Sequence, residues 1–228
     1  MKLHVAGVAS LLVLAAAAST AGAVTFDATN TASDTPGGQR FDEAVGLDYA
    51  EQVLSDASAF VWNIFSQPNP ADRRPVDAVT LVVEDIDGVA FTGGSDIHLS
   101  AQYVGGYSAG DVKTEVTGVL YHEVVHVWQW GLQDYGAHSG IFEGIADFVR
   151  LKAGLARGHW VKPGQGDRWD QGYDVTARFL DYCDSLMPGF VAQLNAKLKD
   201  GYSEDYFVQI LGKDVQQLWQ DYKAKYGG

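Results

Sequence analysis

The sequence predicts an α+β protein, with an N-terminal α/β lobe built on a mixed sheet, a central buried helix and a helical C-terminal lobe. Three observations support this prediction. Short runs rich in β-branched residues lie in the first half of the chain, before Val104. The stretch from Val112 to Trp130 is apolar on most helical faces, which is typical of a buried helix. The segment from Asp170 to Tyr226 has helical spacing with breaks at Pro188-Gly189, Gly201 and Gly212.

The first residues are interpreted as a signal peptide. A positive Lys2 precedes an apolar run from Val8 to Ala18, and the small residues Ala21-Gly22-Ala23 follow it. The run is too short and too rich in alanine for a membrane anchor. We expect cleavage after Ala23, which makes the protein secreted and leaves residues 24–228 as a single domain.

The expected elements of the N-terminal lobe follow in order along the chain. Val24 to Asn30 alternates weakly, as a strand does, and Asp34 to Gly38 is expected to form a turn. Apolar residues then recur at helical spacing from about Phe41 to Phe65. Three more strands are predicted, namely a buried one, a short one and an edge strand of alternating polarity, at Ala78 to Glu84, Val89 to Phe91 and Ile97 to Val104.

Composition limits the partners that this chain can have. The formal net charge of the 228 residues is −13, which argues against nucleic acid or an anionic membrane as a partner. The one cysteine, Cys183, lies in a helical stretch, so a buried free thiol is favoured over pairing with another chain. We expect a monomer whose stability depends on an aromatic-rich core, because no disulfide can form within the chain.

The predicted central helix contains His122-Glu123-Val124-Val125-His126, the pattern of the zinc peptidases called zincins. Four helical residues advance about 6 Å, so both imidazoles lie on one face and can bind the same Zn²⁺. Glu123 can take a proton from the water that such a metal binds. The five-residue pattern also occurs by chance, so a third metal ligand is needed to decide.

A catalytic zinc needs three protein ligands and one open position. Metzincins place a further Gly and His after the pattern, but Gln129 and Leu132 stand there, which excludes that class. Gluzincins instead place a glutamate on the next helix. Here Glu143-Gly144-Ile145-Ala146-Asp147 begins 17 residues beyond His126. Glu143 and Asp147 share a helical face, so Glu143 can bind the zinc while Asp147 accepts the distant N–H of a ligand histidine.

These two carboxylates could instead be solvated charges on an ordinary amphipathic helix. The second helix, predicted from Gly140 to Gly154, leaves them little polar surface, because most of their neighbours are apolar: Ile141, Phe142, Ile145, Ala146, Phe148 and Val149. Two unpaired carboxylates in such surroundings would be costly, and a metal and a histidine relieve that cost. The two motifs together predict a gluzincin-like zincin with one Zn²⁺ per chain.

The residues around both motifs resemble those of the plant basic secretory proteins, a pathogenesis-related class grouped with peptidases of plants and bacteria. The similarity extends over essentially the whole chain after the signal peptide and includes His122 to Trp130, Glu143 to Gly154 and Asp167 to Leu180. It implies a secreted, apoplastic, zinc-dependent peptidase linked to plant defence. The chain departs from the family in being acidic, in having Gly140-Ile141-Phe142 before its glutamate, and in the loop from Gln133 to Ser139.

Other residues are weaker candidates for a role in the site. The oxyanion of the scissile carbonyl needs a hydrogen-bond donor opposite the metal, and Tyr173 is proposed for this role, with a core tyrosine as the alternative. His138 and His159 could serve instead, but each is better explained as a loop histidine. Arg168 could bind a substrate carboxylate, although a structural salt bridge is favoured. Trp128 and Trp130 are expected in the core.

The predicted edge strand has two possible uses. Ile97 to Ser100 could pair with the backbone of a bound peptide, or it could be a sheet edge and nothing more. His98, within it, is expected to be exposed.

The function predicted from these residues is peptide-bond hydrolysis by a zinc metallopeptidase that acts on a peptide or protein. In this hypothesis His122, His126 and Glu143 hold the Zn²⁺. Glu123 carries the proton of the attacking water to the leaving amine, and Tyr173 stabilises the oxyanion. The alternative is a non-proteolytic defence protein that keeps zinc for structure and binds a microbial or cell-wall ligand. Glu123 favours the enzyme, because a purely structural site has no need of it.

Overall fold

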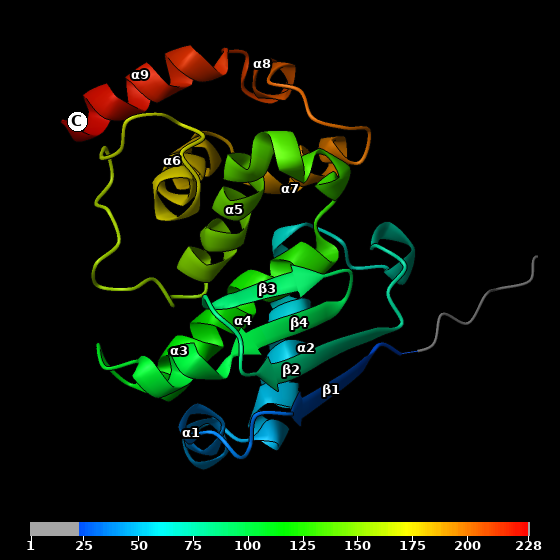
Figure 1. Ribbon diagram of the computed structural model, residues 1–228. Coiled ribbons are helices and arrows are strands. Elements are labelled where there is room, and N and C mark those ends of the chain that lie inside the picture. The colour runs from blue at the N-terminus through cyan, green and yellow to red at the C-terminus, as the bar shows by residue number, and fades with distance from the viewer. Residues whose placement is uncertain (1–22, 228) are drawn as a thin grey trace, which may run out of the picture.

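The computed structural model describes residues 23–227, so the expected signal peptide lies outside the described range except for Ala23. Within that range the chain forms a four-stranded mixed sheet together with many helices, which confirms the predicted α+β class. In Figure 1 the sheet and the N-terminal helices occupy one half of the molecule, and the C-terminal helices are gathered in the other.

The sheet has the spatial order β1-β2-β4-β3. Strands β1 and β4 both run parallel to β2, whereas β3 pairs antiparallel with β4. Along β2, Val79, Leu81 and Val83 are buried and alternate with partly exposed residues, as expected for a strand that packs one face on the core. The bounds are β1 (Thr25–Asn30), β2 (Ala78–Glu84), β3 (Ala90–Gly93) and β4 (Asp96–Ser100).

The predicted edge strand from Ile97 to Val104 is wrong in two respects. Strand β4 lies between β2 and β3, so both of its edges are already hydrogen-bonded and cannot receive a peptide. The strand also ends at Ser100, whose Oγ accepts a hydrogen bond from the Tyr103 backbone N at 3.1 Å and caps a short helix, α3 (Ala101–Gly106). Strand β3 is the edge strand on this side of the sheet.

Two helices, α1 (Pro36–Ala44) and α2 (Leu47–Ile64), replace the turn and the single long helix that were predicted near the N-terminus. Thr35 accepts a hydrogen bond from the backbone N of Gly38 at 3.0 Å, and Pro36 suits the first helical turn, where its missing N–H is not needed. Gly46, with φ of 79°, separates the two helices. The sequence pattern was misread because a capped helix start and a turn share the same residue types.

Helix α4 (Val112–Trp128) lies between α2 and the C-terminal helices and also contacts β3 and β4. The long helix was predicted to end at Trp130, two residues later than it does. Two short 3₁₀ helices cover Pro70–Asp72, before β2, and Leu132–Asp134, after α4. The α-helices that follow are α5 (Tyr135–Lys152), α6 (Tyr173–Leu186), α7 (Phe190–Leu198), α8 (Asp205–Leu211) and α9 (Val215–Tyr226).

The last four helices agree with the predicted breaks at Pro188-Gly189, Gly201 and Gly212. Their core is aromatic, with Phe179, Phe207 and Tyr222 packed ring against ring. Cys183 is buried there as a free thiol, as predicted. Among residues 23–227, none of the helices has the length and apolar character that crossing a membrane requires.

Candidate metal centre

Helix α4 carries three of the predicted site residues, His122, Glu123 and His126. Its first turn is fixed by Asp111, whose carboxylate accepts hydrogen bonds from the backbone N and the hydroxyl of Thr114 at 2.8 and 2.7 Å. The helix is buried on most of its faces, in agreement with the pattern of its sequence. This burial holds both imidazoles against the next helix.

Helix α5 carries Glu143 and Asp147. Gly144 lets this helix approach α6 closely, because a Cβ at that position would collide with the side chain of Thr176. The helix begins at Tyr135 rather than near Gly140, so the segment from Gln133 to Ser139 is largely helical rather than a loop, with non-helical dihedrals at His138.

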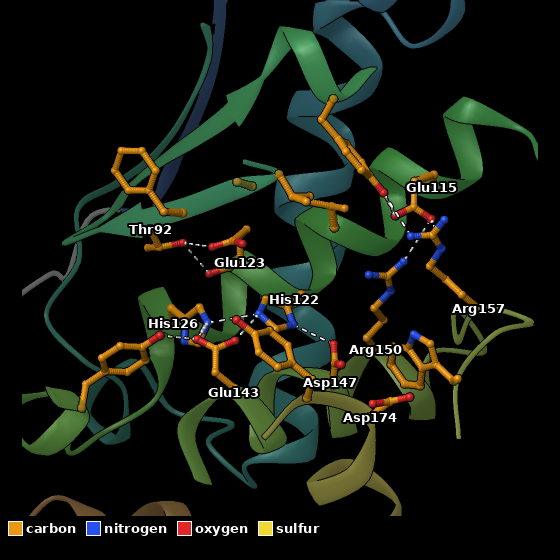
Figure 2. A pocket seen from close by; sticks show the side chains of 18 of the residues that line it. Thr92, Glu115, His122, Glu123, His126, Glu143, Asp147, Arg150, Arg157 and Asp174 are labelled. Carbon is orange, nitrogen blue, oxygen red and sulfur yellow. Dashed lines mark hydrogen bonds and ion pairs between the residues drawn. The ribbon is translucent and has the colours of Figure 1, made fainter. Parts of the chain in front are cut away.

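The structure brings together the three residues predicted to bind metal. His122 Nε2 lies 3.0 Å from Glu143 Oε2 and 3.3 Å from His126 Nε2, and His126 Nε2 lies 3.6 Å from Glu143 Oε1. One ligand atom from each residue can be chosen so that all three lie within 4.8 Å of one another. All three residues are buried, and Figure 2 shows their side chains converging from α4 and α5. This cluster could hold a metal ion.

Asp147 lies behind the cluster, where the sequence placed it. Its Oδ1 is 2.7 Å from Nδ1 of His122. A carboxylate at this nitrogen accepts its N–H and leaves Nε2 with the lone pair that a metal needs. The contact therefore fixes both the orientation and the tautomer of His122.

Gln129 has an equivalent position behind His126. Its side-chain amide lies 2.6 Å from His126 Nδ1 through the atom assigned as Nε2, while its Oε1 is buried without a hydrogen-bond partner. The two ends of an amide side chain have nearly the same shape, so the flipped orientation fits the same space. Exchanging them lets Oε1 accept the Nδ1–H of His126 and leaves His126 Nε2 free for a metal. The cluster thus fits a cation at Nε2 of both histidines.

The electrostatics of the cluster favour positive charge between its side chains. Burial lowers the pKa of His122, but hydrogen bonds with Asp147 and Glu143 outweigh it and raise the pKa to about 10. Burial raises the pKa of Glu143, yet its contacts with His122 and His126 hold that pKa well below the usual range. With Glu123 beside them, three carboxylates surround two imidazoles, and a divalent cation would offset this excess of negative charge.

Glu123 projects from α4 toward strand β3. The hydroxyl of Thr92 lies 2.7 Å from Glu123 Oε2 and 3.1 Å from the backbone O of Glu123. Donation to Oε2 orients the carboxylate and leaves its other oxygen, Oε1, without a hydrogen-bond partner among residues 23–227. Figure 2 shows Thr92 and Glu123 on one side of the histidines.

Two tyrosines lie beside the cluster, and the sequence pointed to only one of them. The ring of Tyr173 stacks on that of His122 at 6.0 Å, and its side chain is 56% exposed with a left-handed backbone φ of 46°. Tyr135 was missed because it lies in the segment taken for a loop. Its hydroxyl donates to Glu143 Oε1 at 2.5 Å. Burial raises the pKa of both phenols, with the negative charge of Glu143 adding to the effect, so both remain protonated donors at neutral pH.

The other residues that the sequence suggested for the site differ in whether they line the cavity beside this cluster. His138 stacks on Tyr202 at 3.7 Å and does not line the cavity, whereas His159 does. Arg168 is exposed and lies 3.6 Å from Asp170, which agrees with the favoured salt bridge. His98 is partly exposed rather than fully so, since it contacts Glu84.

The predicted tryptophans differ in burial. Trp128 is buried and donates to Ser58 Oγ at 3.0 Å, as expected of a core residue. Trp130 is only partly buried, with Lys199 over its ring.

The metal cluster opens into a cavity of about 890 Å³, large enough for several residues of a peptide. One wall is formed by strand β3, including Ala90, Phe91 and Thr92. Glu115, Arg150 and Arg157 line a further part of it. Sequence reasoning did not find this second group.

The sequence is similar to a family of peptidases and to a named protease. A family model described as peptidase of plants and bacteria matches residues 21–222. A protein named "Basic secretory protease" from Boswellia serrata is 51% identical over 59 residues, which are 26% of this chain and 67% of that protein. No solved structure matches the sequence. The two matches confirm the resemblance to the basic secretory proteins.

Proposed function

The chain belongs to the family of peptidases of plants and bacteria, and from this we propose that it is a secreted, zinc-dependent metallopeptidase of the gluzincin type. The observation that carries the proposal is the convergence of His122, His126 and Glu143 on one point, with Glu123 next to it. A general base beside a metal-binding cluster is what hydrolysis requires and what a structural metal site lacks.

The donor set favours zinc among the common divalent ions. Two imidazoles and one carboxylate are the ligands of many catalytic zinc sites, whereas magnesium and calcium prefer oxygen ligands alone. Asp147 and Gln129 would hold the two imidazoles with Nε2 facing the ion. When bound, zinc would polarise the scissile carbonyl and make a water more acidic.

Glu123 is proposed as the general base and acid. Its Oε2 is occupied by Thr92, so Oε1 is the oxygen that takes the proton of the attacking water. The same oxygen then delivers that proton to the nitrogen of the leaving amine. Thr92 orients the carboxylate throughout, because its hydroxyl keeps Oε2 fixed.

Tyr135 and Tyr173 are the two proposed donors to the oxyanion of the scissile carbonyl. Both hydroxyls carry a proton at neutral pH, and both rings lie beside the ligands, Tyr135 against Glu143 and Tyr173 over His122. A hydrogen bond that forms only as negative charge develops on the carbonyl oxygen lowers the barrier. We therefore assign the role to this pair, rather than to Tyr173 alone.

The substrate backbone would lie along β3. Among the residues that the structure describes, this strand pairs only with β4, and it borders the cavity where Thr92 contacts Glu123. An extended peptide adding to this edge would bring its carbonyl groups past the catalytic residues. The role that the sequence suggested for Ile97 to Ser100 thus passes to Ala90–Gly93.

Secretion, the apoplast and defence also belong to this proposal. The signal peptide predicted over residues 1–23 and the name of the Boswellia serrata relative, a secretory protease, both support secretion. A monomer of a single domain spanning residues 24–228 is proposed, with a peptide or protein as its substrate. A role in plant defence follows from the family resemblance alone.

The test combines metal analysis with the substitution Glu123→Gln. We expect about one zinc per chain in both proteins, because Glu123 is not a ligand. Cleavage of a protein substrate should stop on chelation of the wild type and fall by at least about a thousandfold in the variant, because the general base is lost. Thr31→Val, at an exposed position just after β1, loses the hydroxyl that donates to the backbone O of Val83. It serves as the control and should cleave normally, because β1 and β3 lie at opposite edges of the sheet.

Equal cleavage by Glu123→Gln and wild type would contradict the proposal, as would a protein purified without chelators that contains no zinc. A protein that holds zinc in stoichiometric amounts but cleaves no peptide would favour the alternative, a non-proteolytic defence protein.

A further inference from the structure

A second buried cluster of charged side chains lines the cavity, about two turns of α4 away from His122. Glu115 lies on α4, Arg150 near the end of α5 and Arg157 in the loop that follows. Glu115 and Arg150 are only 4% and 7% exposed. In Figure 2 the three side chains lie together, on the opposite side of His122 from His126.

Glu115 is fully occupied by donors. Its Oε2 lies 3.0 Å from Arg157 Nε and 3.3 Å from Arg150 Nη2, and its Oε1 accepts the hydroxyl of Tyr103 at 2.8 Å. Two guanidinium groups therefore share one carboxylate. The contacts within this group leave one positive charge in excess.

The guanidinium of Arg150 is held rigidly, but not all of its donors are used. Its Nε donates to the backbone O of Leu155 at 3.1 Å, and a Cβ at Gly118 would collide with the group. Nη1 has no hydrogen-bond acceptor within the part of the chain that the structure describes. A second carboxylate, Asp174, lines the same part of the cavity, but among residues 23–227 it forms no ion pair with Arg150 or Arg157, and its Oδ2 accepts the backbone N–H of Val161 at 2.7 Å.

A buried cation that shares its anion is incompletely compensated, and an anionic group of a ligand would complete the pairing. Guanidinium groups match carboxylates in particular, because their parallel N–H groups can donate to both oxygens at once. The chain as a whole carries a net charge of −13, so this local excess of positive charge is unusual for the molecule.

The distance from the metal cluster fits a peptide. Glu115 and His122 are seven residues apart on α4, which corresponds to about 10 Å along the helix axis. An extended peptide advances about 3.4 Å per residue, so this span covers about three residues of a substrate.

We propose that Arg150 and Arg157 form a subsite for a carboxylate of the substrate within about three residues of the scissile bond. The proposal rests on the peptidase function proposed above. The carboxylate comes either from a Glu or Asp side chain or from the C-terminus of the peptide, and the chemistry of recognition is the same for both.

Matched peptides distinguish the two sources. One series compares Glu with Gln at each of the three positions on either side of a single cleaved bond, and a second compares a free C-terminus with its amide. We expect kcat/KM to be about tenfold higher for the charged peptide at one position or for the free terminus, the ratio that charge-assisted hydrogen bonds provide.

Arg157→Gln tests the residue assignment, because the Arg157 side chain is 21% exposed and its replacement disturbs the fold less than replacement of Arg150. The preference for the charged peptide should fall to less than about twofold in this variant. Arg168→Gln is the matched control, since Arg168 is exposed, pairs with Asp170 and does not line the cavity. It should retain the full preference.

Binding to the Glu123→Gln variant separates this inference from the peptidase proposal. Calorimetric titration with the charged and neutral peptides of each pair measures affinity without turnover. Tighter binding of the charged peptide, lost in Glu123→Gln/Arg157→Gln, would support the subsite even if the wild type cleaved nothing. Equal binding and equal cleavage of charged and neutral peptides at every position, or a preference unchanged by Arg157→Gln, would overturn it.

Discussion

At the metal end of the cavity, α4 and α5 contribute two imidazoles and the carboxylates of Glu123, Glu143 and Asp147. About two turns along α4, Glu115 meets the guanidinium groups of Arg150 and Arg157. Both ends use the same faces of the same two helices, and the loop after α5 adds Arg157 to the second. One end has an excess of negative charge, whereas the contacts at the other leave an excess of positive charge.

This contrast shows how the sign of an uncompensated buried charge indicates the kind of ligand that a site suits. Burying a charge is tolerated only where partners are supplied. At the metal end the missing partner is a cation, and at the arginine end it is an anion. Helical spacing places the two ends in line, because Glu115, His122 and His126 recur on one face of α4.

The largest effect is expected when a proposed metal ligand is removed from the metal end. Glu143→Ala removes a direct ligand and should lower zinc affinity by more than the roughly 100-fold that loss of an outer partner costs, so that purified protein contains almost no zinc. Metal analysis after dialysis measures this loss. Glu204→Ala, at an exposed position, is the control and should keep about one zinc per chain. If Glu143→Ala retained zinc, the third ligand would have to be a residue other than Glu143.

The next largest effect is expected at the arginine end, where Glu115 contacts Arg150 and Arg157, and the substitution there leaves the metal ligands unchanged. Glu115→Gln leaves the buried guanidinium of Arg150 and the partly buried one of Arg157 without their shared anion and should lower the free energy of unfolding by about 3 kcal/mol. Urea unfolding followed by tryptophan fluorescence measures the change. The partly exposed pair of Glu84 and His98 is the comparison, because Glu84→Gln should cost less than about 1 kcal/mol. If both variants lost a similar free energy of unfolding, Glu115 would stabilise the fold no more than a partly exposed ion pair does.

A smaller effect sharpens the role of the groups behind the metal ligands. Asp147→Asn keeps a hydrogen-bond acceptor at His122 but removes a negative charge, so zinc affinity should fall by about 10- to 100-fold while the protein still binds zinc at saturation. Competition with a zinc chelator measures the affinity. Asp181→Asn, on the exposed side of α6, should leave it within about twofold. An unchanged affinity for Asp147→Asn would show that Asp147 is not coupled to the metal.

The smallest effect concerns Tyr103, which supports the arginine end. Burial and its hydrogen bond to Glu115 raise the pKa of Tyr103 to about 12. The folded protein thus holds this proton more tightly than the unfolded chain, whose tyrosines titrate near pH 10. The stability that results is fully present below about pH 10 and is lost as the pH rises toward 12.

Tyr103→Phe removes this contribution, so the free energy of unfolding should fall less steeply between pH 10 and pH 12 than it does in the wild type. Urea unfolding at a series of pH values gives both slopes. If the two proteins showed the same dependence of unfolding free energy on pH, the pKa of Tyr103 would not differ between the folded and unfolded states.

The metal end was predictable because its residues repeat at helical intervals within short stretches of sequence. His122, His126 and Glu143 form a pattern that can be recognised without a structure. Tyr135 lies eight residues before Glu143, but its segment, Gln133 to Ser139, contains Gly136 and polar residues that are typical of a loop. Gln129 was noticed only as the residue that excludes metzincins.

The arginine end and the sheet order were not predictable in the same way. Glu115 and Arg150 are 35 residues apart, and no local pattern reports that they meet. The alternation of Ile97 and Leu99 identified a strand but not its neighbours, because an internal strand with one buried face alternates like an edge strand. The capped start of α1 at Thr35-Pro36 resembled a turn for a similar reason, since both use the same residue types.

The parts of the protein also differ in how far apart in the chain their contacts are. His122 and Asp147 are 25 residues apart, so the whole metal cluster comes from one helical hairpin, α4 and α5. In the sheet, the hydroxyl of Thr31, just after β1, donates a hydrogen bond to the backbone O of Val83 on β2, 52 residues away. Local contacts form sooner during folding than distant ones, because shorter loops must be closed. We therefore expect the hairpin to form before β1 pairs with β2, so that the three proposed metal ligands would meet before the sheet is complete.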